Sequence, residues 1–405
     1  MGEMQSSVAV EGTRKPDVAP KAISDAVLAQ ADVEGRRKPD GAVKEIDKYF
    51  AAAVKLKASD LHMKVGQPPL FRVGGTLRPA NAPPFTLDQL SALFAEILGS
   101  KENRQLEQQG GADFAYSIRG VGRFRVNIFR QRGTLSLAAR AVKTELPTIE
   151  QLNLPPGIKK IPSLDNGLVL LSGITGSGKS TTLAALIEII NQSQPLHIVT
   201  IEDPIEYLYK DEKAIVNQRE VGIDVPDFAN GLRSVVRQDP DVILVGEMRD
   251  AETFEMALMA AETGHLVFGT IHASTAGQTI GRVLDYFPTE RHYQIRQLLY
   301  FNLRAVIVQK LLQGLRRDIP RVPAVEIMFV NALIKKLIFE SEDKKIADAI
   351  RTFRHEGMQD FNQSLCDLVK RGLVGEDVAM EASPNPDQLA MNLRGVSFSA
   401  GSLSE

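Results

Sequence analysis

The stretch Gly173-Ile174-Thr175-Gly176-Ser177-Gly178-Lys179-Ser180 decides the fold of this chain. It matches the phosphate-loop pattern, in which a glycine, four further residues and a second glycine are followed by Lys and Ser. An apolar run at 168–171 precedes the stretch and a helix-forming run at 182–188 follows it, as expected for a loop between a buried strand and a helix. A glycine-rich turn without a ligand is the alternative, and this context disfavours it. We therefore predict a nucleoside triphosphate site.

Each part of this loop has a physical role in holding a triphosphate. Glycines permit the tight backbone conformations that aim several N–H groups at one anion, and the start of the following helix adds its positive dipole end. Lys179 is expected to reach the β- and γ-phosphates, and the Ser180 hydroxyl to serve as a Mg²⁺ ligand. ATP and Mg²⁺ are the predicted cofactors, and the predicted nucleotide-binding residues are Gly173, Thr175, Gly176, Ser177, Gly178, Lys179, Ser180 and Thr181.

Length and composition are those of a soluble globular protein with more than one domain. The chain has 405 residues, of which 43% are hydrophobic and 24% charged, so two or three folded units are expected. The net charge of -2 gives no overall attraction to nucleic acid or acidic lipid. A single cysteine, Cys366, excludes an internal disulfide and a multi-cysteine zinc site. No apolar run reaches the roughly 18–20 residues that span a bilayer, so we expect a cytoplasmic protein.

The first 145 residues divide into a tail and a small domain. Residues 1–42 show no sustained periodicity and are predicted to be disordered, with a short helix near Ile23–Ala31. They contain an imperfect repeat, Glu11–Asp17 against Glu34–Asp40, which fits either a solvated low-complexity tail or an interaction motif presented twice. Over 43–145, helical spacing and strand alternation follow one another, which predicts a compact α+β domain.

One strand of this domain, Arg123–Ile128, concentrates arginine on one face. A period of two places Phe124, Val126 and Ile128 on the buried side, so Arg123 and Arg125 share the opposite side. Their separation of two residues, roughly 6.6 Å, suits guanidinium groups that straddle a triphosphate. A solvated strand face without a ligand accounts for the same pattern, and the residues alone leave both interpretations open.

The rest of the chain predicts an α/β domain. Residues 146–166 are rich in proline and indicate a linker. Over 167–380, strand-like runs alternate with helical patterns, which predicts a parallel sheet covered by helices, with further helices toward the C-terminus. Residues 381–405 are expected to form a flexible tail.

Three polar side chains follow predicted strands of this domain, where the ligands of open α/β sheets belong. Glu247 ends the run 241–247 and is expected to organise the metal through water, because Gly246 occupies the place where an Asp usually stands. Glu206, in the acidic stretch 200–206, is the preferred general base for activating water. His272 follows the run 266–271 and is placed to sense the γ-phosphate or contact a neighbouring subunit. Surface carboxylates in turns and a structural histidine are the alternatives.

Together these stretches resemble the secretion-type ATPases that drive type IV pili, and most closely the twitching-motility retraction ATPases (the PilT family). The resemblance runs from about Val43 to Val374, and its motifs occur in the family's order. They are the phosphate loop 173–180, the acidic box 200–206, the second Walker element 241–250 and the histidine box 263–272, with further matches at 58–62, 122–127 and 216–222.

The resemblance implies a PAS-like N-terminal domain joined to a RecA-like P-loop ATPase domain, assembled as a homohexamer. It implies that Arg123, Arg125 and Arg140 reach the nucleotide phosphates, and it supports Glu206 for water and Glu247 for metal. The implied function is ATP hydrolysis to ADP and phosphate that powers pilus retraction at the inner-membrane face. The implied partners are an inner-membrane platform protein and the pilus machinery, with no nucleic acid and only peripheral contact with the membrane.

Two features bear on the choice among relatives. A single cysteine argues against the extension and type II secretion ATPases, which usually carry a tetracysteine zinc module. The segment Ala332–Glu340 alters a motif common near the C-terminus of retraction ATPases, which leaves an accessory retraction paralogue open. A RecA-like nucleic-acid translocase and a non-hydrolysing regulatory scaffold are remoter alternatives, the first disfavoured by the near-neutral charge.

Overall fold

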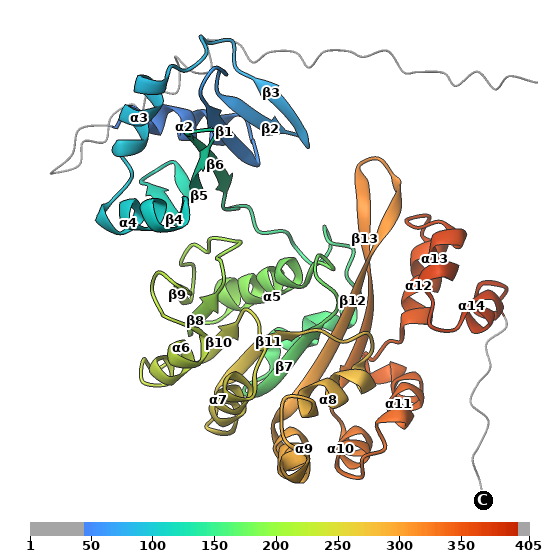
Figure 1. The fold of residues 1–405 in the computed structure, drawn as a ribbon. Helices are drawn as coiled ribbons and strands as arrows, with labels where there is room; N and C mark the ends of the chain where they lie inside the picture. The colour runs from blue at the N-terminus through green and yellow to red at the C-terminus, as the bar shows by residue number, and fades with distance from the viewer. Residues whose placement is uncertain (1–43, 396–405) are drawn as a thin grey trace, which may run out of the picture. The chain divides into compact units, whose positions relative to one another are not determined.

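The computed structural model describes residues 44–395 of the chain, which form two compact units divided between Val142 and Lys143 (Figure 1). The predicted disordered tail at 1–42, its repeat and its short helix lie outside the described residues, as do residues 396–405. Within 44–395, no helix combines the length and the apolar character needed to cross a bilayer.

The N-terminal unit is an α+β domain built on a six-stranded antiparallel sheet in the order β3-β2-β1-β6-β5-β4. Helix α3 begins after Thr86, whose hydroxyl accepts from the backbone N–H of Gln89 while the Gln89 side chain accepts from the Thr86 N–H. The elements are α2 (Asp47–Lys55), β1 (Asp60–Lys64), β2 (Leu70–Val73), β3 (Thr76–Pro79), α3 (Leu87–Ala95), α4 (Ser100–Gln109), β4 (Gly111–Ile118), β5 (Gly122–Gln131) and β6 (Thr134–Ala141).

Alternation along β5 divides the N-terminal sheet into an apolar and a polar face. Phe124, Val126 and Ile128 are at most 1% exposed and belong to the core of this unit. Arg125, between them, is exposed, and Arg123 is partly exposed on the same face. The alternation predicted from the sequence is confirmed, because a strand directs successive side chains to opposite faces.

The C-terminal unit is built on a seven-stranded sheet in the order β13-β12-β7-β11-β10-β8-β9. All neighbouring pairs are parallel except β12 and β13, which form an antiparallel hairpin that extends beyond the other strands (Figure 1). This mixed sheet is the RecA-like arrangement expected. Its strands are β7 (Gly167–Ser172), β8 (His197–Glu202), β9 (Ile215–Glu220), β10 (Val242–Val245), β11 (Leu266–Ile271), β12 (Leu303–Arg316) and β13 (Ile319–Phe329).

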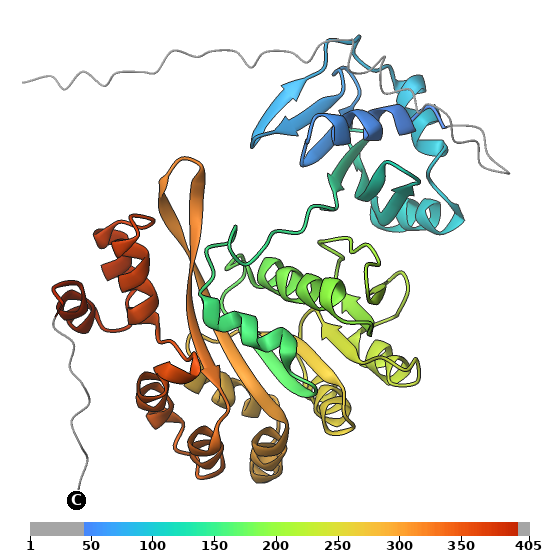
Figure 2. The ribbon, with the colours of Figure 1, turned by 180° about the vertical axis from the view of Figure 1, so that it is seen from behind.

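Both faces of this sheet are buried, because its central strands are apolar at successive positions. On β7, Leu168 and Leu170 pack in one cluster with α6–α9, whereas Val169 and Leu171 pack in the other with α5 and the 3₁₀ helix η1. Figure 2 shows η1 and α5 on the same side of the sheet. The helices are α5 (Lys179–Ser193), α6 (Phe228–Val235), α7 (Ala251–Glu262), α8 (Ala276–Leu284) and α9 (His292–Asn302), and η1 spans Pro156–Ser163.

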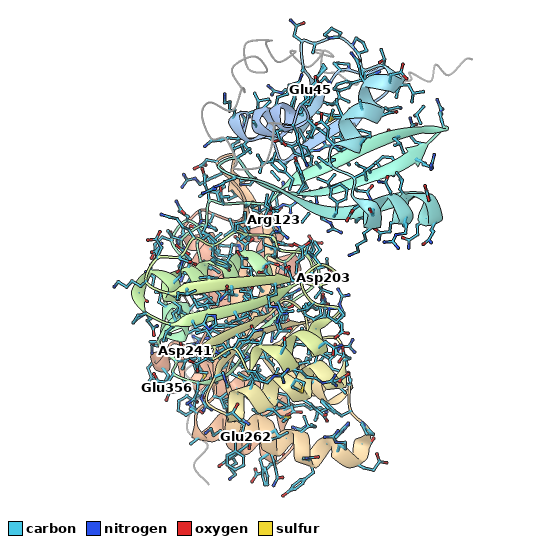
Figure 3. All side chains as sticks on the ribbon, turned by 90° about the vertical axis from the view of Figure 1, so that its left-hand side faces the viewer. Glu45, Arg123, Asp203, Asp241, Glu262 and Glu356 are labelled. Carbon is cyan, nitrogen blue, oxygen red and sulfur yellow. The ribbon has the colours of Figure 1, made fainter. Side chains whose placement is uncertain are left out.

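Parallel strands place the ligand site at one end of the sheet. Asp203 directly follows β8 and Asp241 directly precedes β10, and Figure 3 shows the two side chains at opposite ends of these neighbouring strands. In an open α/β sheet, ligands bind beyond the carboxyl ends of the strands. The end marked by Asp203 is therefore the end at which a site is expected.

Part of the stretch predicted as a linker, 146–166, instead packs into the core of the C-terminal unit. Ile158 and Ile161 of η1 are fully buried beside α5, and Ile149 and Leu154 belong to the same cluster. Proline fixes φ and is well placed at the start of a helix, so these prolines shape the segment without loosening it.

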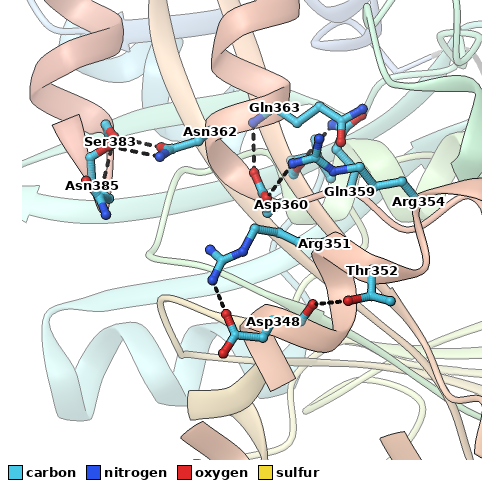
Figure 4. Close-up of polar contacts among 11 residues, drawn as sticks. Asp348, Arg351, Thr352, Arg354, Gln359, Asp360, Asn362, Gln363, Ser383 and Asn385 are labelled. Atoms are coloured by element: carbon cyan, nitrogen blue, oxygen red, sulfur yellow. Dashed lines mark hydrogen bonds and ion pairs between the residues drawn. The ribbon is translucent and has the colours of Figure 1, made fainter. Parts of the chain in front are cut away.

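Helices α10 to α14 follow β13, and polar contacts link the ends of α11, α12 and α13 (Figure 4). Asp360 caps α12 by accepting from the Gln363 N–H over 2.8 Å, and its other oxygen accepts from Arg354 over 3.0 Å. Helix α14 lies inside the stretch predicted as a flexible tail, and its Leu389 is fully buried. The elements are α10 (Ala332–Phe339), α11 (Ile346–Thr352), α12 (Phe361–Lys370), α13 (Glu376–Ala382) and α14 (Pro386–Leu393).

Candidate nucleotide site

The phosphate loop joins β7 to α5 and depends on glycine at two positions. Gly173 and Gly178 have φ angles of 140° and 91°, which residues with a side chain rarely adopt. A Cβ on Gly173 would lie 2.4 Å from the carbonyl oxygen of Gln309, and one on Gly178 would lie 2.7 Å from Gln309 Nε2. Both glycines are therefore required by backbone conformation and by space.

Gln309 on β12 fastens this loop to the sheet. Its side chain is 3% exposed. Its Nε2 donates to the Ser177 carbonyl over 2.7 Å, and its Oε1 accepts from Thr182 Oγ1 over 2.8 Å. One amide thus holds both the loop and the first turn of α5. The sequence analysis did not identify Gln309, because 132 residues separate it from Ser177 and no local pattern signals the contact.

Lys179 opens α5 and lies across the loop. Its Nζ donates to the carbonyl oxygens of Gly173 and Ile174 over 2.7 and 3.2 Å. Burial lowers the pKa of Lys179, and the charge of Glu247 partly opposes that effect. Ser180, the predicted metal ligand, follows directly and is exposed. The loop therefore presents backbone N–H groups, an ammonium group and a hydroxyl on one side, which is the donor set for a polyphosphate.

Glu247 and His272 meet at the ends of β10 and β11. The Nε2 of His272 lies 3.0 Å from Glu247 Oε1, and Arg249 hydrogen-bonds to the other carboxylate oxygen. The bond from Arg249 is the largest influence that lowers the pKa of Glu247, burial acts in the opposite direction, and His272 lowers it further. Glu247 is therefore ionised at neutral pH. Glu247 and His272 were expected near the phosphates from their positions after strands, whereas their contact with each other and the bond from Arg249 have no local signal in the sequence.

Two hydroxyl groups tie the strand ends of the site together. Ser172 is fully buried, and its Oγ accepts from the Ala273 N–H over 2.8 Å and donates to the Ala273 carbonyl over 3.0 Å. Thr270 Oγ1 donates to the Gly246 carbonyl over 2.6 Å. These bonds join residues that lie directly beside the phosphate loop, His272 and Glu247 in the chain.

The acidic stretch after β8 supplies a second carboxylate. Glu206 is exposed, and its carbonyl accepts from the Lys143 N–H over 3.3 Å, while the Leu208 N–H donates to the Lys143 carbonyl over 2.8 Å. Burial raises the pKa of Glu202, whose Oε1 accepts from Thr200 over 2.7 Å. Of the two glutamates, Glu206 is the one open to a bound water.

Most of the predicted site residues line a single cleft of about 590 Å³, a size typical of small-molecule sites. Gly173 and Ser177 do not line it. The predicted residues that do are Thr175, Gly176, Gly178, Lys179, Ser180, Thr181, Glu206, Glu247 and His272. Residues that the sequence analysis did not single out also line it, namely Lys143, Glu202, Tyr207, Tyr209, Arg249, Leu311 and Arg321.

The donor set fits Mg²⁺ in the manner usual for triphosphate sites. Mg²⁺ takes hard oxygen ligands and is held by one or two protein groups together with substrate phosphates. Ser180 and Glu247 supply a hydroxyl and an ionised carboxylate in the same cleft. Both Glu247 oxygens already accept hydrogen bonds, which favours contact through water. No cluster of three or more His, Cys, Asp or Glu within residues 44–395 forms a metal site of its own.

The three predicted arginines belong to the N-terminal unit, whereas the described lining of the cleft comes from the C-terminal unit. Arg125 lies opposite Arg140 on the neighbouring strand β6. Arg140 Nε donates to Asp60 Oδ1 over 2.9 Å. Burial raises the pKa of Asp60, but bonds from Arg140 and Ser59 outweigh it and keep that pKa below its usual value. Arg140 is thus held by an ionised partner, and contact of these arginines with a nucleotide stays a prediction.

Comparison with known proteins places this site in a family. The family model described as type II/IV secretion system protein matches residues 37–336. The chain is 43% identical over 343 residues to the type IV pilus retraction ATPase PilT of Pseudomonas aeruginosa, covering 85% of this chain and 99% of that protein. It is 35% identical over 355 residues to the type IV pilus ATPase PilU of the same organism, covering 86% and 91%.

A solved structure agrees with these sequence matches. The crystal structure of the pilus retraction motor PilT with bound ADP has a TM-score of 0.78 and 44% identity to this chain, covering 86% of this chain and 99% of that one. The fold and the nucleotide cleft described above are therefore those of an ATPase. The chain belongs to the type II/IV secretion system protein family, within its PilT group of ATPases.

Proposed function

We propose that this chain is the ATP-hydrolysing motor that powers type IV pilus retraction and hence twitching motility. The observation that carries the proposal is the convergence of the phosphate loop, the Glu247–His272 pair and Glu206 on one cleft. The match to nearly the full length of PilT, with higher identity than to PilU, favours the principal motor over an accessory paralogue.

Each group in the cleft has a task in phosphoryl transfer to water. The phosphate loop and Lys179 hold the triphosphate, and Glu206 orients the attacking water. Ser180 and Glu247 would hold Mg²⁺, which when bound neutralises charge on the phosphate oxygens. His272, bonded to Glu247, senses the γ-phosphate. Preorganised donors of this kind stabilise the transition state because they need no reorganisation as charge develops.

We propose further that the chain works as a homohexamer at the cytoplasmic face of the inner membrane. In a closed state Arg123, Arg125 and Arg140 contact the nucleotide phosphates, and release of phosphate reopens the site. A closed site excludes water and strengthens each charged contact. The partners are an inner-membrane platform protein and the pilus machinery, without nucleic acid.

Two substitutions separate binding from turnover in the purified chain. Lys179→Ala should abolish ADP and ATP binding, because the triphosphate loses its ammonium partner. Glu206→Gln should keep nucleotide affinity within about threefold and lower kcat by at least about 100-fold, as expected for loss of a water-positioning group. Equilibrium binding and steady-state phosphate release measure the two effects. A similar loss of binding in both variants would contradict this division of roles.

Deletion of the gene tests the cellular function. Loss of a retraction motor should give cells with excess pili and no surface motility, and the wild-type gene but not the Lys179→Ala variant should restore motility. Cells without pili would indicate an extension ATPase instead. Normal motility, lost only when a second retraction ATPase is also deleted, would favour the accessory role suggested by the altered segment Ala332–Glu340.

A further inference from the structure

The Tyr207 hydroxyl connects two residues of the nucleotide cleft. Tyr207 is 4% exposed. Its hydroxyl oxygen lies 3.2 Å from Lys143 Nζ and 3.0 Å from Thr181 Oγ1. The Lys143 ammonium also lies 5.0 Å from the centre of the Tyr207 ring, a cation–π contact that holds it in place. Lys143, Tyr207 and Thr181 therefore form one continuous chain of contacts, and all three line the cleft.

The chemistry and burial of these groups favour one direction for the hydrogen bonds along the chain. An ammonium group has three donors and no acceptor, so Tyr207 must accept from Lys143. Either hydroxyl of the Tyr207–Thr181 pair could donate. The Tyr207 phenol is buried, however, and among residues 44–395 Thr181 Oγ1 is its only hydrogen-bond partner able to accept the phenol proton, so Tyr207 is assigned as the donor. Having accepted that bond, the Thr181 hydroxyl directs its own proton elsewhere. The positive charge at Lys143 strengthens each bond of the chain by polarising the next.

The position of Thr181 indicates where that proton goes. Thr181 lies in the first turn of α5, directly after Ser180, where the helix dipole favours anions. Within residues 44–395 the Tyr207 hydroxyl is the only hydrogen-bond partner of Thr181 Oγ1. The acceptor that suits this donor is an oxygen of the bound polyphosphate.

We propose that Lys143 and Tyr207 are positioning residues that orient the Thr181 hydroxyl as a donor to a phosphate oxygen of the nucleotide. The inference rests on the nucleotide site proposed above and adds two residues to it. Tyr207 directly follows Glu206 in the chain. The Lys143 N–H donates to the Glu206 carbonyl and the Lys143 carbonyl accepts from the Leu208 N–H, so the backbone of Lys143 pairs with the residues on both sides of Tyr207. The same contacts thereby fix the loop that carries the candidate general base.

A double-mutant cycle tests the chain of hydrogen bonds. ADP affinity is measured by titration for the wild-type chain, Lys143→Met, Tyr207→Phe, Thr181→Val and the double variant Lys143→Met/Thr181→Val. Each single substitution should weaken ADP binding about five- to tenfold, the effect of one hydrogen bond of ordinary strength. The double variant should bind ADP no more weakly than Thr181→Val, because Lys143 acts through that hydroxyl.

Two control variants test the charge at position 143 and the stability of the chain. Lys143→Arg keeps a donor-only cation and should retain affinity within about twofold. Lys335→Met removes a lysine held over Tyr300 at 5.5 Å on α10, outside the cleft, and should not change ADP binding. Equal loss in Lys335→Met would assign the effect to general destabilisation and overturn the inference.

The remaining outcomes separate this inference from the proposed function. If the losses of ADP affinity in Lys143→Met and Thr181→Val add up in the double variant, Lys143 acts on the nucleotide by its own charge. That result would overturn the proposal that Lys143 acts through the Thr181 hydroxyl. Unchanged affinity in Tyr207→Phe would overturn it as well. A wild-type chain that binds no ADP would refute the proposed function and this inference together, whereas a wild-type chain that binds ADP as tightly as all its variants would refute the inference alone.

Discussion

Replacing Gln309 by alanine should loosen the phosphate loop without touching any residue that contacts phosphate through its side chain. The substitution removes two buried hydrogen bonds, of 2.7 Å to the Ser177 carbonyl and 2.8 Å from the Thr182 hydroxyl. A buried polar group left without its partner costs about 1–3 kcal/mol, so the two together predict a loss of about 2–6 kcal/mol in the free energy of unfolding. For a domain of this size that corresponds to a fall in Tm of roughly 5–15 °C.

Nucleotide affinity should fall as well, because the bound loop must be held in the conformation that Gln309 now stabilises. ADP binding must then supply the stabilisation that the substitution removes from the loop. Each 1.4 kcal/mol supplied in this way weakens ADP binding about tenfold, so we expect the affinity to fall about 10- to 100-fold. Calorimetric titration with ADP and thermal unfolding of the same samples measure the two effects.

Gln359 provides a matched control for this substitution. It is also buried, at 9% exposure, and its Nε2 donates to the Val325 carbonyl over 3.0 Å, beside the polar contacts of Figure 4. Gln359→Ala should lower Tm by a few degrees and leave ADP affinity within about twofold. Unchanged ADP affinity in Gln309→Ala, or an equal loss in both variants, would refute the role assigned to Gln309.

Three further substitutions have measurable outcomes. Arg249→Met should raise the pKa of Glu247 and move the acid limb of the kcat/KM profile to higher pH, because the bond from Arg249 is the main influence that lowers this pKa; a pH–rate profile with an unmoved acid limb would contradict this. Burial raises the pKa of Glu326 from 4.5 to about 7, so ionisation of this carboxyl group destabilises the folded chain as pH rises through that interval. Glu326→Gln should therefore raise Tm more at about pH 8 than at about pH 5. Equal Tm shifts in thermal melts at both pH values would argue against this. Gly173→Ala should abolish ADP binding, because its Cβ would lie 2.4 Å from the Gln309 carbonyl oxygen; titration that detects normal affinity would show that the loop tolerates a side chain there.

Local patterns predicted the parts of the fold whose signals lie close together in the chain. The phosphate loop, the strands at 242–245 and 266–271 and the polar face of β5 were all predicted where the structure has them. Helix α4 was missed because its sequence, Ser100–Gln109, is almost entirely polar and buries only Leu106. A helix with one apolar contact gives no periodic signal.

Two segments were predicted to be less ordered than they are, because their overall composition outweighed the local signals for a helix. The prolines between 146 and 166 indicated a linker, but Ile158 and Ile161, three residues apart, form the buried side of η1. The predicted tail was likewise too long at its start, because α14 begins at Pro386 with Asn385 as its cap, a pairing favoured at helix N-termini.

In the candidate site, too, local patterns predicted the residues that belong to short motifs but not their distant partners. Lys179, Glu206, Glu247 and His272 each belong to a short motif, and the structure brings all of them to one cleft. Gln309 reaches the loop from 132 residues away, and neither it nor the contact of Lys143 with Tyr207 has a local pattern. Which distant residues meet in the site depends on the order of the strands in the sheet, and the spacing of residues in one sequence does not reveal that order.

The hydroxyl bonds of Ser172 and Thr270 have a consequence for how a motor of this design would transmit force. They join the ends of three adjacent strands into one stiff block that holds the phosphate loop, His272 and Glu247 at fixed separations. These groups are therefore expected to move little relative to one another during hydrolysis. Any movement coupled to hydrolysis is therefore expected in parts of the chain that these bonds do not join.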